Sequence, residues 1–135
     1  MSYEFPIAKD TLIQAARNAR IHAYAPYSKF AVGAALISED GAVFTGCNVE
    51  NISFGLTVYA ERACISKAIE DGKRKFIAIA VVSDSKEPVV PCGACRQVLA
   101  EFSPELRVIS CTTDGEVAEF ALDTLLPSAR QGILG

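Results

Sequence analysis

Residues 59–97 read YAERACISKAIEDGKRKFIAIAVVSDSKEPVVPCGACRQ, and this stretch decides the fold. Its pattern predicts one helix over 57–70, closed by Gly72, and a second helix over 92–102. Between them, the continuous apolar run at 76–82 is typical of a buried strand. Parallel β-α units bring the starts of successive helices to one edge of a sheet, where open α/β sheets bind ligands. We therefore expect the starts of these two helices to meet in space.

The remaining segments place this unit within a single α/β domain over residues 1–135. Hydrophobic and turn patterns predict helices at 8–24 and 122–126, a strand hairpin at 30–37 and 43–49, and short strands at 107–111 and 117–120. The resulting order, α-β-β-α-β-α-β-β-α, predicts a mixed five-stranded sheet between helical layers, which is a three-layer α-β-α architecture.

Composition narrows the possible function classes. The chain has 135 residues, of which 50% are apolar and 21% are charged, and this is enough for one packed core. A net charge of −3 provides no basic surface, so no nucleic-acid partner is expected. No apolar run approaches the roughly 20 residues of a membrane span, and we expect neither a signal peptide nor a membrane partner. Five cysteines, an odd number, favour reduced thiols and a cytoplasmic location.

A glutamate and a pair of cysteines indicate metal chemistry at the helix starts. Cys92 and Cys95 place their sulfurs on one side of a helical turn, where the helix dipole favours the thiolate that binds zinc. A catalytic zinc takes three protein ligands and keeps a fourth position for water, whose proton Glu61 would remove. Pro-Cys-x-x-Cys downstream of such a glutamate is the signature of zinc-dependent nucleobase deaminases. A redox pair of Cys92 with Cys95 is the alternative.

Further segments extend this match, and with them the chain resembles the small homotetrameric cytidine deaminases over nearly its whole length. The matching segments are 25–35 (APYSKFAVGAA), 46–51 (GCNVEN), 55–62 (GLTVYAER), 91–97 (PCGACRQ) and 125–127 (LLP). The resemblance implies a cytidine-deaminase-like domain, one Zn²⁺ per subunit, and a homotetramer with shared active sites. It also implies that a zinc-activated water converts cytidine or deoxycytidine to uridine or deoxyuridine in pyrimidine salvage.

The resemblance also implies which residues form the site. These are Glu61 as general acid and base; Phe30, Asn48, Glu50 and Ala60 against the pyrimidine nucleoside; Cys92 and Cys95 on zinc; and Arg62 and Arg96 beside the thiolates. From the residues alone, Asn48 and Glu50 alternate onto one face of an extended segment and suit sugar hydroxyls, or they form a solvated strand end. Phe30 fits a core position equally well, and the two arginines fit the surface.

Tyr59 departs from the pattern, which has Cys or His at this position. A phenol loses its proton near pH 10, and its oxygen lies farther from the backbone than a cysteine sulfur, so Tyr59 is a doubtful third ligand. Either the helix start shifts so that Tyr59 ligates, or two thiolates remain, or the ring excludes zinc. Cys64 is a poor substitute, because it lies about 140° round the helix from position 59.

Two function classes therefore stay open. One is a zinc-dependent hydrolase with an altered metal site, which the retained Glu61, Cys92 and Cys95 favour. The other is a nucleoside-binding relative with impaired or lost catalysis, whether Tyr59 is natural or engineered. A second departure lies at 128–130, where the family has an aromatic residue and this chain reads SAR. The guanidinium plane of Arg130 is the group there that could stack on a base.

Overall fold

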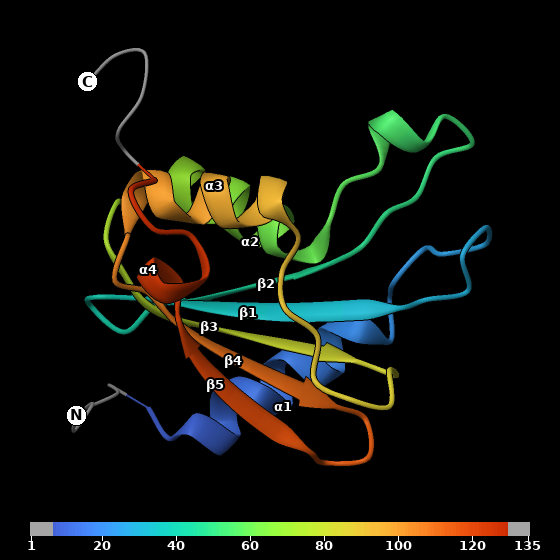
Figure 1. Ribbon diagram of the computed structural model, residues 1–135, viewed down its shortest axis with the longest axis horizontal. Coiled ribbons are helices and arrows are strands. Elements are labelled where there is room, and N and C mark those ends of the chain that lie inside the picture. The colour runs from blue at the N-terminus through green and yellow to red at the C-terminus, as the bar shows by residue number, and fades with distance from the viewer. Residues whose placement is uncertain (1–6, 130–135) are drawn as a thin grey trace.

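The computed structural model describes residues 7–129 and contains the predicted elements in the predicted order (Figure 1). Its helices are α1 (Lys9–Arg20), α2 (Ala60–Glu70), α3 (Gly93–Phe102) and α4 (Leu122–Leu125), with a short 3₁₀ helix, η1 (Phe54–Leu56). Its strands are β1 (Val32–Ser38), β2 (Val43–Cys47), β3 (Phe76–Ser83), β4 (Arg107–Thr112) and β5 (Val117–Ala121). Within the described range, no helix is long and apolar enough to cross a membrane.

The five strands form one mixed sheet in the order β2-β1-β3-β4-β5, as predicted. Strand β1 runs antiparallel to both of its neighbours, β2 and β3, whereas β3 and β4 are parallel. Two antiparallel steps give β2 and β3 the same direction, although β1 lies between them. The helices that follow these strands, α2 and α3, therefore begin at the same edge of the sheet (Figure 1).

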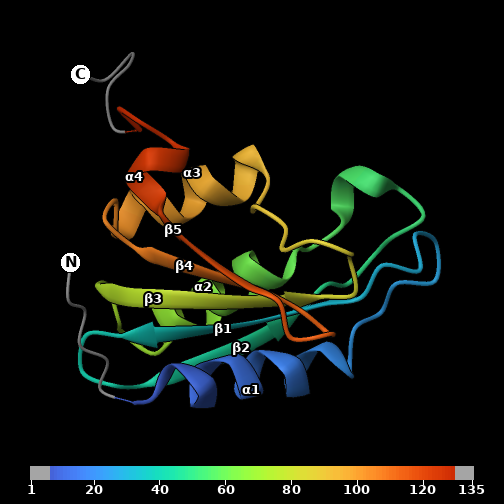
Figure 2. The same ribbon diagram turned by 60° about the horizontal axis from the view of Figure 1, so that its bottom comes forward.

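The sheet is the middle of three layers, with α1 on one face and α2, α3 and α4 on the other (Figure 2). Successive residues of β1 belong to opposite cores: Ala35 packs with Leu12 of α1, and Leu36 packs with Cys64 and Leu99 under α2 and α3. A strand that is buried on both faces has no polar face, which explains its nearly continuous apolar sequence. Burying each such leucine contributes about 1.5–3 kcal/mol.

A glycine in β2 brings the start of α2 close to the sheet. A Cβ atom added at Gly46 would lie 2.7 Å from the carbonyl oxygen of Ala60 and 2.8 Å from the Cβ of Ala63. Only glycine permits such a close approach without moving the helix. Gly46 therefore fixes where the first turn of α2, including Glu61, lies.

Two helices are shorter than predicted, because residues at their predicted ends form backbone hydrogen bonds with a distant segment instead. The first ends at Arg20 rather than at residue 24, since the Tyr24 amide donates to the Asn48 carbonyl at 2.9 Å. The second begins at Ala60 rather than at residue 57, since Val58 pairs with Val49 in an antiparallel bridge. Local periodicity carries no information about partners this distant in the sequence.

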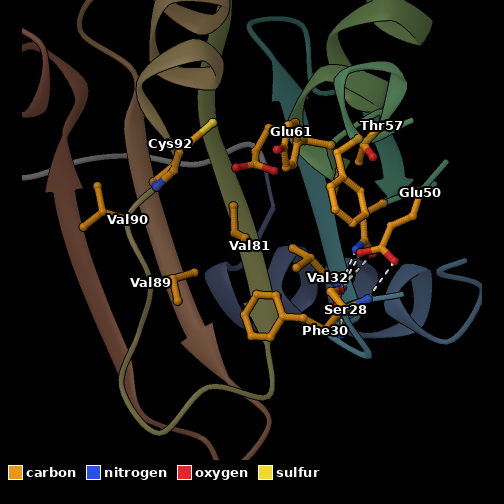
Figure 3. Close-up of a pocket in the computed structure, with 15 residues that line it drawn as sticks. Ser28, Phe30, Val32, Glu50, Thr57, Glu61, Val81, Val89, Val90 and Cys92 are labelled. Carbon is orange, nitrogen blue, oxygen red and sulfur yellow. Dashed lines mark hydrogen bonds between the residues drawn. The ribbon is translucent and has the colours of Figure 1, made fainter. Parts of the chain in front are cut away.

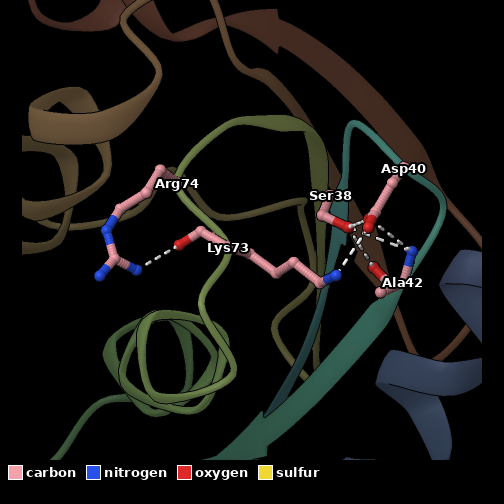
Figure 4. Close-up of polar contacts among 5 residues, drawn as sticks. All are labelled: Ser38, Asp40, Ala42, Lys73 and Arg74. Carbon is pink, nitrogen blue, oxygen red and sulfur yellow. Dashed lines mark hydrogen bonds and ion pairs between the residues drawn. The ribbon is translucent and has the colours of Figure 1, made fainter.

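A polar cluster closes the β1–β2 hairpin at the sheet edge opposite the starts of α2 and α3 (Figure 4). The Ser38 hydroxyl donates to one oxygen of Asp40, and the Lys73 ammonium donates to the other at 2.6 Å. The hydrogen bond from Lys73 and then that from Ser38 lower the pKa of Asp40 from 3.8 to about 2. The cluster ties the hairpin to the loop between α2 and β3.

Candidate functional site

The starts of α2 and α3 open onto a cavity of about 610 Å³ at one edge of the sheet (Figure 3). Its walls come from the segments before β1 and after β2, from the start of α2, and from the β3–α3 loop. The residues that line it are Ser28, Phe30, Val32, Asn48, Glu50, Phe54, Thr57, Tyr59, Ala60, Glu61, Val81, Val89, Val90, Pro91 and Cys92. All four residues predicted against the nucleoside are among them.

Glu61 lies in the first turn of α2 and is only 6% exposed. Figure 3 shows its carboxylate at the same end of the cavity as the Cys92 side chain. Burial raises the pKa of Glu61, and the nearby charge of Arg62 partly opposes that rise. A raised pKa is the direction that allows a carboxyl group to serve as a general acid as well as a general base.

The two predicted metal-binding cysteines lie at the start of α3. Cys92 is the exposed N-cap residue, and Cys95 is buried one turn later. We expected the helix start to favour thiolates, but burial, followed by the charge of Glu61 and the Cys92 thiol, raises the pKa of Cys95. A bound zinc ion would act on this thiol in the opposite direction, because it favours the thiolate.

Tyr59 is the N-cap residue of α2, lines the cavity and is 43% exposed. The guanidinium carbon of Arg62 lies 5.3 Å from the centre of its ring, a cation–π distance. Arg62 also donates to the Thr57 carbonyl at 3.1 Å, which fixes the guanidinium over the ring. Arg62, predicted to lie beside the thiolates, thus contacts the residue at the third ligand position.

The donor set does not fit a catalytic zinc ion. Residues 7–129 contain no group of three or more His, Cys, Asp or Glu side chains that could hold a metal. Cys64 forms no such group with them, and it packs in the core beneath α2. The site supplies two thiols where a catalytic zinc needs three protein ligands.

Arg96 braces the loop that precedes Cys92. Its Nε donates to the Pro91 carbonyl at 2.7 Å, and its Nη1 donates to the Leu125 carbonyl at 2.9 Å. Arg96 therefore connects the start of α3 to the end of α4. Its predicted role in neutralising thiolates stays a prediction.

At the opposite end of the cavity, Asn48 and Glu50 are tied to the chain before β1. The side-chain oxygen of Asn48 accepts from the backbone amide of Val32 at 2.9 Å, and its side-chain nitrogen donates to the Phe30 carbonyl at 2.8 Å. One oxygen of Glu50 accepts from the backbone amides of Tyr27 at 3.0 Å and of Ser28 at 3.1 Å. We call the group Ser28, Phe30, Asn48 and Glu50 the sugar end, because a sugar is expected there, and the group Tyr59, Glu61, Cys92 and Cys95 the metal end, because zinc is expected there.

Ser28 was missed by sequence reasoning. Its hydroxyl donates to Glu50 and accepts from the Phe30 amide at 3.0 Å. A serine that bonds the amide two residues later is a common turn motif, and this local signal was available in the sequence. The bond to Glu50 spans 22 residues and had no such signal. The expected contribution of Arg130 lies outside the described residues.

Comparisons with known proteins identify the family of the chain. The family model described as "Cytidine and deoxycytidylate deaminase zinc-binding region" matches residues 7–111. The cytidine deaminase of Halalkalibacterium halodurans is 50% identical over 122 residues, which cover 90% of this chain and 92% of that protein. The cytidine deaminase of Sporosarcina psychrophila is 49% identical over 121 residues, covering 89% of each chain. The crystal structure of cytidine deaminase from Burkholderia pseudomallei matches with a TM-score of 0.88 at 49% identity, covering 90% of this chain and 98% of that one.

Proposed function

This chain belongs to the cytidine deaminase family, and from that premise we propose that it hydrolyses cytidine or deoxycytidine to uridine or deoxyuridine and ammonia. The observation that carries the proposal is the buried Glu61 carboxyl, which lies with Cys92 at one end of a cavity. The other end carries the amide and carboxylate of Asn48 and Glu50, which suit the hydroxyls of a sugar.

In the proposed reaction Glu61 moves the proton. Its carboxylate takes a proton from the water that attacks C4 of the cytosine ring, and the resulting acid protonates the departing amine. The second proton of the water ends on N3 of the ring, the water oxygen becomes the carbonyl oxygen of uridine, and ammonia leaves. Burial of Glu61 supports this role, because it raises the pKa toward the range in which both transfers are efficient.

The family resemblance implies zinc on Cys92 and Cys95, with a third ligand at position 59. No described His, Cys, Asp or Glu side chain completes a group of three ligands, and the Tyr59 ring lies against Arg62, which supports the proposal that no third ligand is present. Glu61 then has to activate the water by removing its proton without help from a positive ion. We therefore expect slow turnover compared with a chain in which position 59 carries a ligand.

A second candidate function is nucleoside binding with impaired or lost catalysis. The same Tyr59–Arg62 contact favours it, because the metal end lacks a ligand while the hydrogen bonds of the sugar end are all in place. Such a chain would bind cytidine and uridine with similar affinity and would release no ammonia.

We also propose a homotetramer that works in the cytoplasm, in pyrimidine salvage. The segment between β2 and α2 extends away from the body of the fold beside the cavity (Figure 1). It exposes Ile52, Phe54 and Leu56 by 80%, 72% and 67%, respectively. Contiguous exposed apolar side chains are typical of protein interfaces. Light scattering should give about four chain masses, and a monomer would contradict the assembly.

Two assays on one protein preparation separate the candidate functions. The loss of cytidine absorbance, with ammonia release, measures deamination, and calorimetry with uridine measures binding without turnover. Turnover that disappears in Glu61→Gln supports the hydrolase. Uridine binding with no turnover supports the second candidate, and the absence of both contradicts nucleoside binding altogether.

A further inference from the structure

The Ser28 hydroxyl joins two parts of the sugar end that come from separate segments. It donates to the Glu50 carboxylate, and it accepts from the backbone amide of Phe30 at 3.0 Å. Figure 3 shows Ser28 between Glu50 and Phe30 on one side of the cavity. One hydroxyl therefore contacts a charged acceptor and the backbone amide of Phe30, whose carbonyl is held separately by Asn48.

Glu50 is held on both of its oxygens. One oxygen accepts from the Tyr27 and Ser28 amides, and the other accepts from the Ser28 hydroxyl. Replacing Ser28 by alanine keeps both amide bonds to Glu50 and removes the two bonds of the hydroxyl, the one to Glu50 and the one from the Phe30 amide. The carboxylate would then be free to rotate about its remaining contacts, so that its second oxygen no longer has a fixed direction.

The turn around Ser28 depends on these contacts. Lys29 has a φ of 61°, in the left-handed region that is unfavourable for a lysine. The backbone keeps this conformation because the bonds to Glu50 hold it on one side. On the other side, Asn48 holds the Phe30 carbonyl and the Val32 amide. The loss of the Ser28 hydroxyl therefore weakens the contacts with Glu50 and leaves the hydrogen bonds of Asn48 in place.

We propose that Ser28 is a positioning residue that fixes the Glu50 carboxylate toward the sugar hydroxyls of the bound nucleoside. This inference rests on the proposed nucleoside function. Ser28 acts through Glu50, so its contribution should appear only when the ligand carries the hydroxyls that Glu50 binds. A group ordered before binding does not lose further freedom when the ligand arrives, and this favours affinity.

Calorimetry with uridine and with 2′,3′-dideoxyuridine tests the proposal, since the two ligands share a base and differ only in sugar hydroxyls. Ser28→Ala should bind uridine about tenfold more weakly, as expected for the loss of an ordered charged acceptor, and should bind dideoxyuridine as the parent does. Ser28→Thr, which keeps the hydroxyl, should restore most of the affinity for uridine. Ser66→Ala on the exposed face of α2 is the matched control and should change neither affinity.

Equal weakening toward both ligands, or an unchanged affinity for uridine, would overturn the positioning role. Ser28→Cys is nearly isosteric but donates weakly, so it repeats the test if Ser28→Ala folds poorly. A parent protein that binds uridine no better than dideoxyuridine would contradict the proposed function itself. A parent that prefers uridine, with Ser28→Ala keeping that preference, would contradict the inference about Ser28 alone.

Discussion

The sugar end and the metal end of the cavity are built in different ways. Hydrogen bonds between two short segments, 27–32 and 48–50, order the sugar end before any ligand arrives. The metal end needs side chains from the starts of α2 and α3, and it depends on the residue at position 59. A network with several bonds keeps its remaining bonds when one is lost, whereas a catalytic zinc site needs all three of its protein ligands.

The Tyr59–Arg62 contact contributes much less free energy than a complete zinc site would. The stacking of Arg62 on Tyr59 is worth about 0.5–1 kcal/mol at a partly exposed site. Structural zinc sites in small domains bind with about 10–16 kcal/mol. The stacking therefore replaces only a small part of what a complete metal site would contribute. We therefore expect position 59 to control metal binding and catalysis.

The largest expected effect lies at Glu61. In a chain that carries Tyr59→Cys, adding Glu61→Gln should lower deamination by at least about 100-fold, because the amide cannot accept the proton from water. The measurement is the loss of cytidine absorbance, with uridine affinity by calorimetry as the control for intact binding. Residual turnover above about one per cent of the Tyr59→Cys chain would remove Glu61 from this role.

At the sugar end we expect a smaller loss that is independent of catalysis. Glu50→Ala should weaken uridine binding by about 1.5–3 kcal/mol, the usual contribution of a hydrogen bond to a charged group. Asn48→Ala should weaken binding as well and should also lower the melting temperature, because it leaves the partly buried Val32 amide without its acceptor. Unchanged uridine affinity in both variants would mean that other residues hold the sugar.

The Asp40 cluster lies away from both ends and provides a reference for a purely structural polar group. Its carboxyl has a pKa lowered to about 2 in the folded chain, chiefly by Lys73. Folding therefore gains stability from Asp40 above pH 3.8, and this gain is lost as the pH falls toward 2. Asp40→Asn should flatten the pH dependence of chemical denaturation in that window and leave uridine affinity unchanged. A parallel pH dependence in parent and variant would contradict this account.

The sequence predicted the order of elements and the meeting of Glu61 with Cys92, because both follow from local periodicity and strand direction. It could not predict that α2 begins at Ala60, since the pairing of Val58 with Val49 decides that end. It also missed the bond from Ser28 to Glu50, which depends on two segments meeting in space. The sequence also did not predict the contact of Arg62 with Tyr59. The family resemblance had placed Arg62 beside the thiolates instead.

The zinc content of three matched preparations tests the central claim most directly. We expect the parent and Tyr59→Phe to hold well below one zinc per chain after dialysis against a weak chelator, because neither offers a third ligand of suitable reach. Tyr59→Cys should hold about one zinc per chain, and it should deaminate cytidine at least about tenfold faster, or about 1.4 kcal/mol in the barrier. If the parent already holds one zinc and loses it in Tyr59→Phe, the phenol is a ligand. If Tyr59→Cys holds no more zinc than the parent, position 59 does not control the metal end. Either result would contradict the account.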